Sequence, residues 1–232
     1  MAETPKRVVI TGAAGALGRA IAHAFATAGA QLALIDRAQE PKDFPEVSGS
    51  QYFFIGAVDL ADPAQAKRAM DSIAARLGGI DVLVNVAGGF RWETVADGKP
   101  DTWDFMYTIN LKTALCAAQA ALPHLSRSAG RIINVGAAGA AKAGKGMGAY
   151  AASKAGVAKL TEALAEELKD QGINVNAVLP SILDTAPNRA DMPDADFTRW
   201  VAPAALADVV VFLASNGARA ITGASIPVLG RV

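Results

Sequence analysis

The stretch RVVITGAAGALGRAIAHAF, residues 7–25, decides how the rest of the sequence is interpreted. A short β-branched run is followed at once by a turn containing Gly12, Gly15 and Gly18, and then by apolar residues at helical spacing. A glycine-rich turn between a strand and a helix is the context in which backbone amides bind the pyrophosphate of a dinucleotide. We therefore predict a dinucleotide site at the first strand–helix junction.

Each glycine of this turn has its own expected role. Gly12 permits the tight turn, Gly15 lets a phosphate approach the backbone, and Gly18 lets the helix pack against the sheet. Asp36 follows at the end of the second predicted strand, where a carboxylate accepts hydrogen bonds from the adenosine ribose and repels a 2'-phosphate. We expect NAD(H), while Arg37 leaves NADP(H) as the alternative. The other interpretation of Asp36 is a solvated residue that ends a strand.

Short apolar runs alternate with longer segments of helical spacing along the whole chain. The expected strands are residues 7–11, 31–36, 52–58, 81–87, 131–136, 174–180 and 224–230; the expected helices are residues 17–29, 63–77, 102–122, 150–170 and 203–215. This alternation is typical of an α/β protein with helices on both faces of a parallel sheet. We expect a single-domain Rossmann fold over residues 1–232, a doubly wound sheet of about seven strands. Asp62 before Pro63 predicts a helix N-cap.

Two segments depart from the alternation. Residues 37–50 contain Pro41, Pro45 and Gly49, so no full helix is expected there. Residues 181–203 are rich in Pro, Asp and Asn and separate the sixth strand from the last helix. A long connection of this kind is often functional, so we expect a substrate lid, with a merely disordered loop as the alternative.

The composition excludes several classes of function. Lys plus Arg and Asp plus Glu number 22 each, so no strong field gathers nucleic acid or an anionic membrane. No apolar run approaches the roughly 18 residues of a membrane helix, and the start of the chain lacks a signal-peptide pattern. The lone Cys116, with His23 and His124 at no metal-ligand spacing, indicates neither disulfides nor a metal. We expect a cytoplasmic protein acting on a small-molecule substrate.

Tyr150 and Lys154 lie four residues apart on a predicted helix, so both project from one face. A tyrosine is a weak acid–base catalyst at neutral pH, and an ammonium nearby that stabilises the phenolate lowers its pKa. The spacing by itself is common and fits a surface pair equally well. Behind a dinucleotide turn it favours a catalytic pair.

Further motifs extend the pattern: VDLAD with Asp59 and Leu60, NVAG at residues 85–88, Asn110, YAASK at residues 150–154, and VLP ending at Pro180. Together with TGAAGALG they resemble the short-chain dehydrogenase/reductase family. The resemblance makes Tyr150 the proton donor or acceptor, Lys154 the ligand of the nicotinamide ribose, and Asn110 the holder of a relay water. The expected cofactor-binding residues are Gly12, Gly15, Ala16, Leu17, Gly18, Asp36, Arg37, Asp59, Leu60, Asn85, Ala87, Gly88, Tyr150, Lys154 and Pro180.

Two positions depart from the family pattern. Ala16 replaces the glycine usually found one place before Leu17, which changes the backbone geometry of the turn. Ala137 stands thirteen positions before Tyr150, where the family has its catalytic serine. Alanine cannot donate a hydrogen bond to a carbonyl oxygen, and the loss of one such donor costs on the order of 10²-fold or more in rate. A water or Ser181 is a candidate replacement.

Quinonoid dihydropteridine reductases also lack this serine, and their GMxxYxxxK run and lid are similar to GMGAYAASK and to residues 179–200 here. This resemblance implies hydride transfer to a quinonoid pterin. Asn110, however, follows the general family pattern. The alternatives are a carbonyl or 3-oxoacyl reductase and a catalytically silent dinucleotide sensor.

Several other residues are candidates for the site or for assembly. Phe90 and Trp200 are interpreted either as walls for a flat substrate or as ordinary packing, and Trp92 as packing. Asn188 and Arg189 in the expected lid are candidates for pterin contacts, with exposed lid polarity as the alternative. The resemblance also implies a homodimer or homotetramer formed through the helices near residues 103–122 and 150–170.

Overall fold

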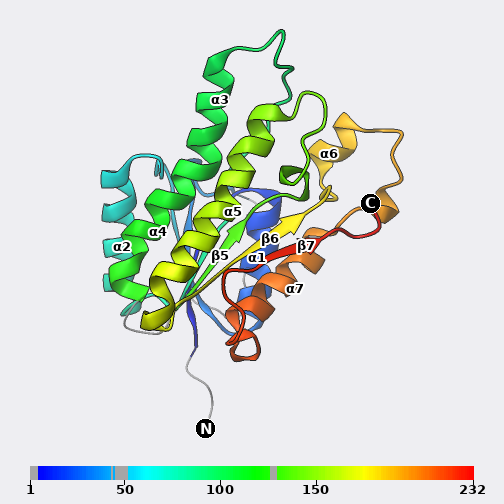
Figure 1. Cartoon of the computed structure of the whole chain (residues 1–232). Coiled ribbons are helices and arrows are strands. Elements are labelled where there is room, and N and C mark those ends of the chain that lie inside the picture. Colours follow the sequence, from blue (N-terminus) through cyan, green and yellow to red (C-terminus); the bar gives the residue numbers. More distant parts are fainter. Residues whose placement is uncertain (1–4, 43, 45–51, 126–129) are drawn as a thin grey trace.

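A computed structural model describes residues 5–42, 44, 52–125 and 130–232 (Figure 1). Seven strands form one sheet in the order β3-β2-β1-β4-β5-β6-β7, and neighbouring strands pair in parallel. They are β1 Arg7–Thr11, β2 Gln31–Ile35, β3 Tyr52–Ile55, β4 Val82–Asn85, β5 Arg131–Val135, β6 Asn174–Pro180 and β7 Ser225–Val228. The predicted α/β doubly wound sheet is confirmed.

Helices cover both faces of this sheet, as Figure 1 shows. One face packs against α1 (Ala16–Thr27) and α7 (Pro203–Ala214), and the other against α2 (Pro63–Leu77), α4 (Thr113–Leu125) and α5 (Gly148–Leu168). Successive strand residues point to opposite faces, so Val8 joins the first core cluster and Val9 the second. Strands buried on both sides need apolar residues at nearly every position, which is why they read as continuous runs.

The helix predicted over residues 102–122 has a more complex form. It begins as α3 (Pro100–Met106), continues as a π-helical turn over Tyr107–Lys112, and becomes α4. Apolar periodicity does not distinguish such a turn from an α-helix, so the sequence did not predict it. Single π-helical turns within helices are frequent at functional sites.

At the edge of the sheet, β3 is shorter than the predicted strand 52–58, whereas the absence of a full helix after β2 agrees with the prediction over the described residues. Strand β3 ends before Gly56, where a β-carbon would lie 2.6 Å from the Gln39 side-chain oxygen, and Ala57 then adopts a positive φ of 58°. Between β2 and β3, residues 36–42 form no helix, and residues 43 and 45–51 lie outside the described residues. The predicted cap of α2 is confirmed, because the Asp62 carboxylate accepts from the Ala64 amide at 2.8 Å, with Pro63 in the first turn.

The glycine turn after β1 is pressed against the end of β4. Gly12 has a φ of 64°, and a β-carbon on it would lie 2.7 Å from the Ala87 nitrogen. The Thr11 hydroxyl oxygen accepts hydrogen bonds from the amides of Val86 and Ala87, each at 3.1 Å. Strands β1 and β4 are the point where the strand order reverses, and ligands bind in the crevice at such a point.

Replacing Gly18 with alanine tests whether the first helix needs this close approach. A β-carbon there would lie 2.3 Å from the Gly12 carbonyl oxygen, whereas at Gly15 the nearest atom is the same oxygen at 3.5 Å. We expect Gly18→Ala to lower the free energy of unfolding by about 1–3 kcal/mol, since overpacking costs this much. Gly15→Ala, the matched control, should cost under about 1 kcal/mol. Equal losses in urea denaturation would contradict this account.

Candidate active site

The start of α1 presents backbone donors to the crevice. Gly15 is the N-cap and forms no side-chain cap, so the first-turn amides remain available to an anion. Ala16 is exposed, whereas Leu17 and Gly18 are buried and fix the helix against the sheet. These residues fit the pyrophosphate of a dinucleotide, and Ala16 adds only a methyl group at the exposed position.

Asp36 lies at the end of β2 and is joined to the same turn. Its two carboxylate oxygens accept from the amides of Ala14 and Ala38, both at 2.9 Å. Each oxygen keeps a further lone pair that can accept from a ribose hydroxyl. Arg37 beside it is exposed.

Asp59 and Leu60, the predicted adenine contacts, follow β3. Asp59 is exposed and its carboxylate accepts from the Ala61 amide at 2.9 Å, while Leu60 is buried in the core. Asn85 is also buried, and its side-chain amide donates to Asn134 at 2.9 Å. The Asn85 side chain therefore belongs to the interior, and its predicted contact with a cofactor is limited to the backbone. Pro180 is buried at the end of β6, paired with Val228.

Lys154 and Tyr150 both lie on α5, where burial acts on them in opposite directions. The Lys154 ammonium donates to the Val135 carbonyl at 2.7 Å, and burial lowers its pKa from 10.5 to about 8. Burial raises the pKa of the Tyr150 phenol. The direction for Tyr150 is opposite to that expected from a neighbouring ammonium, because loss of water around the phenolate dominates.

Asn110 reaches the same place from the π-helical turn. Its side-chain oxygen accepts from the Gly89 amide at 2.9 Å, and its nitrogen donates to the Gly89 carbonyl at 3.1 Å. A β-carbon on Gly88 would lie 2.5 Å from this Asn110 oxygen and 3.4 Å from the Lys154 nitrogen. Asn110 and Lys154 therefore converge on the backbone of Gly88, in the loop that follows β4.

Ala137 is buried and extended just before a 3₁₀ turn, Ala138–Ala140, and contributes only a methyl group. The candidate replacement Ser181 uses its hydroxyl elsewhere, since it donates to the Leu229 carbonyl at 2.7 Å. This bond argues against Ser181 as the substitute donor.

An aromatic side chain, that of Phe90, packs against Tyr150. The ring of Phe90 meets that of Tyr150 edge to face, with centroids 5.0 Å apart, and 54% of Phe90 remains exposed. Trp92 lies on Gly146 and donates from its indole nitrogen to the Lys145 carbonyl at 3.0 Å. This contact agrees with the packing role predicted for Trp92, and it joins the loop after β4 to the loop before α5.

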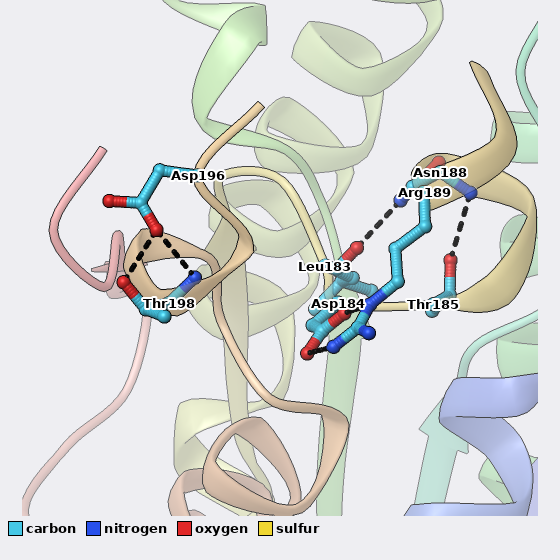
Figure 2. A network of polar contacts seen from close by, with 7 residues as sticks. All are labelled: Leu183, Asp184, Thr185, Asn188, Arg189, Asp196 and Thr198. Atoms are coloured by element: carbon cyan, nitrogen blue, oxygen red, sulfur yellow. Dashed lines mark hydrogen bonds and ion pairs between the residues drawn. The ribbon is translucent and has the colours of Figure 1, made fainter. Parts of the chain in front are cut away.

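Residues 181–203 form a structured segment above the ends of β6 and β7, with α6 spanning Ala186–Asp191 (Figure 1). Figure 2 shows its polar side chains directed at one another. Arg189 forms an ion pair with Asp184, with bonds of 2.6 and 2.8 Å that hold the pKa of Asp184 below its usual value. Asn188 donates to the Leu183 carbonyl at 2.8 Å. The side chains of Asn188 and Arg189, which were candidates for substrate contacts, thus bond to other residues of the segment.

Trp200 lies near the C-terminal end of this segment. Only 8% of it is exposed, and its ring lies 4.8 Å from that of Phe197. Arg199 donates twice to the Arg231 carbonyl, at 2.9 and 2.6 Å. The burial of Trp200 and its contact with Phe197 favour the packing interpretation of Trp200 over substrate stacking.

Other sequence candidates lie away from the site. Cys116 is buried in the core, and His124 pairs with Asp71 at 3.1 Å. In the part of the chain that the structure describes, no group of three His, Cys, Asp or Glu side chains could hold a metal ion. Across the same residues, no helix is long and apolar enough to cross a membrane.

The sequence and fold of the chain are similar to those of known proteins. A sequence profile described as short chain dehydrogenase matches residues 6–196. The chain belongs to the short-chain dehydrogenase family. Members of this family are oxidoreductases that use a nicotinamide dinucleotide.

Relatives of known name match nearly the full chain. It is 34% identical over 238 residues to D-threitol dehydrogenase of Mycolicibacterium smegmatis, covering 97% of this chain and 92% of that protein. The chain is 33% identical to the 3-oxoacyl-(acyl-carrier-protein) reductase of Staphylococcus aureus, with 97% of each covered. A crystal structure of carveol dehydrogenase from Mycobacterium avium in complex with NAD superposes with a TM-score of 0.85 at 29% identity, covering 97% of this chain and 96% of that one.

Ser153, Gly89 and the Val135 carbonyl are site components that the sequence did not predict. Ser153 left one signal, because it is a polar residue on the buried face of a helix, one place before Lys154. The Gly89 and Val135 contacts use backbone atoms, which every residue has, so residue type could not identify them in the sequence.

We expect the buried ammonium of Lys154 to make the free energy of unfolding depend on pH. Because the folded-state pKa is lowered to about 8 from 10.5, the unfolded chain binds more protons between these values, and wild-type stability gains from rising pH there. We expect Lys154→Met to be more stable relative to wild type at pH 7 than at pH 10. Thermal unfolding of both proteins at the two pH values measures the difference. Lys142→Met, which removes an exposed ammonium, controls for the lost charge; a pH-independent difference for Lys154→Met would contradict burial as the cause.

Proposed function

We propose that the protein interconverts a carbonyl and a hydroxyl group on a small substrate, with Tyr150 as proton donor in the direction of reduction. The observation that supports this proposal is that Asn110 and Lys154 converge on Gly88, in the loop beside the glycine turn, and that Lys154 shares its helix with Tyr150. The resemblance to the family assigns the same three residues to catalysis.

The protonation states suit this role. A bound nicotinamide would supply the hydride. The raised pKa keeps the Tyr150 phenol protonated at neutral pH, so it has a proton to give as negative charge develops on the substrate oxygen. Lys154, with a pKa of about 8, is mostly an ammonium at pH 7 and stabilises the phenolate that remains. In oxidation the same groups act in reverse.

NAD(H) is the cofactor that we propose, with NADP(H) as the alternative. Asp36 supports this preference because its carboxylate, fixed by two backbone amides, would repel a 2'-phosphate. Arg37, exposed next to it, is the group that would serve the alternative. The ratio of kcat/KM for NADH and NADPH distinguishes the two.

Two substrate classes are supported by different observations. The names of the relatives, a threitol dehydrogenase and an oxoacyl reductase, favour a carbonyl or hydroxyl substrate. Ala137 favours a quinonoid dihydropterin, as in the dihydropteridine reductases that the sequence resembles, because protonation of a ring nitrogen does not need a serine at the carbonyl. The relatives make the first class the leading proposal. The convergent catalytic residues disfavour a silent sensor.

Three further expectations complete the proposal. Residues 181–203 act as a lid, supported by their position above the ends of β6 and β7 (Figure 1). The chain works as a single domain in the cytoplasm. It assembles as a homodimer or homotetramer, as the resemblance implies; exposed Trp103 and Tyr107 near the start of the predicted interface helices are compatible with this.

Turnover by wild type and Tyr150→Phe tests the proposal. NADH oxidation at 340 nm would be followed with diketones, acetoacetyl thioesters and chemically generated quinonoid dihydropterin, and NAD⁺ reduction with diols. We expect wild-type turnover of carbonyl or diol substrates and a loss on the order of 10²-fold or more in kcat for Tyr150→Phe, because the proton donor is removed. NADH affinity, measured by fluorescence, should remain within about threefold. Full activity of Tyr150→Phe would exclude its role.

Restoring a hydroxyl at Ala137 separates the two substrate classes. For a carbonyl substrate we expect Ala137→Ser to raise kcat/KM by about tenfold or more, because the serine donates to the developing oxyanion. Ala141→Ser, which places the same hydroxyl at an exposed position, should change little. Rapid pterin turnover that Ala137→Ser does not improve, with no ketone turnover by either protein, would favour the pterin reductase.

A further inference from the structure

Ser153 carries a buried hydroxyl that has no role in the proposed reaction. It lies on α5 between the two predicted catalytic residues of that helix, and only 5% of it is exposed. Its oxygen donates to the Tyr150 carbonyl at 2.7 Å and accepts from the Asn110 side-chain nitrogen at 3.0 Å. One hydroxyl therefore joins the helix of Tyr150 and Lys154 to the π-helical turn of Asn110.

The direction of these bonds selects one orientation of the Asn110 amide. Ser153 has a single proton, which it gives to the Tyr150 carbonyl, so it can offer Asn110 only a lone pair. The Asn110 nitrogen must then face α5, and its oxygen must face the Gly89 amide, from which it accepts at 2.9 Å. A flipped amide would set its oxygen against the lone pairs of Ser153 and of the Gly89 carbonyl.

Without the hydroxyl, one N–H of Asn110 would lose its strong acceptor, and only the two bonds to Gly89 would be left to hold the orientation. Its nitrogen would retain the Gly89 carbonyl at 3.1 Å and a weak contact with the Met106 sulfur at 3.8 Å. A buried N–H without a strong acceptor is unfavourable, and the amide gains freedom to rotate. The same Asn110 oxygen packs at the Gly88 backbone beside Lys154, so its rotation would reach the centre of the site.

We propose that Ser153 is a positioning residue, which holds Asn110 and its π-helical turn in register with Tyr150, Lys154 and the Gly88–Gly89 loop. A serine that bonds to the carbonyl three residues earlier is a common local feature of helices. The bond from Asn110 is different, because it joins residues 43 apart in the sequence and lies between two elements of the site.

Helix α5 offers a matched control at Thr161. This hydroxyl is also buried, accepts from an asparagine nitrogen, that of Asn134, at 2.9 Å and donates to the Val157 carbonyl at 2.9 Å. Ser153 and Thr161 thus make the same pair of bonds, and only Ser153 contacts the predicted catalytic residues. A general loss of helix stability should follow from either substitution, whereas the positioning effect belongs to Ser153.

The test measures exchange of the Gly89 backbone amide by NMR in Ser153→Ala, Ser153→Thr and Thr161→Ala, together with kcat and the KM for cofactor. We expect Ser153→Ala to speed exchange of the Gly89 amide by about tenfold. The Asn110 side-chain oxygen accepts from this amide, and without the Ser153 hydroxyl the Asn110 amide is less firmly held. The same substitution should lower kcat by about tenfold with KM for cofactor changed less than about threefold. Ser153→Thr, which keeps the hydroxyl, should restore both, and Thr161→Ala should leave Gly89 exchange and kcat near wild type.

Unchanged Gly89 exchange in Ser153→Ala would overturn the proposal, as would equal effects of Ser153→Ala and Thr161→Ala on Gly89 and kcat. The kinetic arm rests on the proposed function, whereas the exchange arm does not. If wild type turns over none of the substrates but Gly89 exchange responds only to Ser153→Ala, the proposed reaction fails and the positioning role stands.

Discussion

The contact between the glycine turn and the end of β4 is the constraint on which the site depends. Gly12 and Ala87 approach so closely that no β-carbon fits between them, and the Thr11 hydroxyl bonds to both amides that follow β4. The loop after β4 therefore starts at a fixed position beside the cofactor turn. From there it carries Gly88 to the point where side chains from two helices meet.

At that point the protein keeps ionisable groups where charge is unfavourable. Burial lowers the pKa of Lys154 and raises that of Tyr150. The two shifts have opposite signs because loss of water disfavours the charged form of each group, the ammonium of Lys154 and the phenolate of Tyr150. The Val135 carbonyl compensates the ammonium in part. Groups whose pKa values are shifted by burial are typical of functional sites, and here both lie on one helix, a single turn apart.

Ala137, Phe90 and residues 181–203 form the proposed substrate side of the site. Ala137 removes a donor that the family usually has, and Phe90 places an exposed aromatic surface against the Tyr150 ring. Within residues 181–203, Arg189 pairs with Asp184 (Figure 2), and its guanidinium lies 4.7 Å from the centroid of the Phe197 ring.

The sequence by itself determined the α/β sheet, the glycine turn, the cap at Asp62 and the shared helix face of Tyr150 and Lys154, because each depends on residues a few positions apart. Only the tertiary structure decided which polar side chains already form hydrogen bonds with other residues. Ser181 bonds to Leu229, and Ser153 bonds to Asn110, across separations that no local pattern records. It also decided the direction of the Tyr150 pKa shift, because burial is a property of the assembled core and not of the residue's neighbours in sequence.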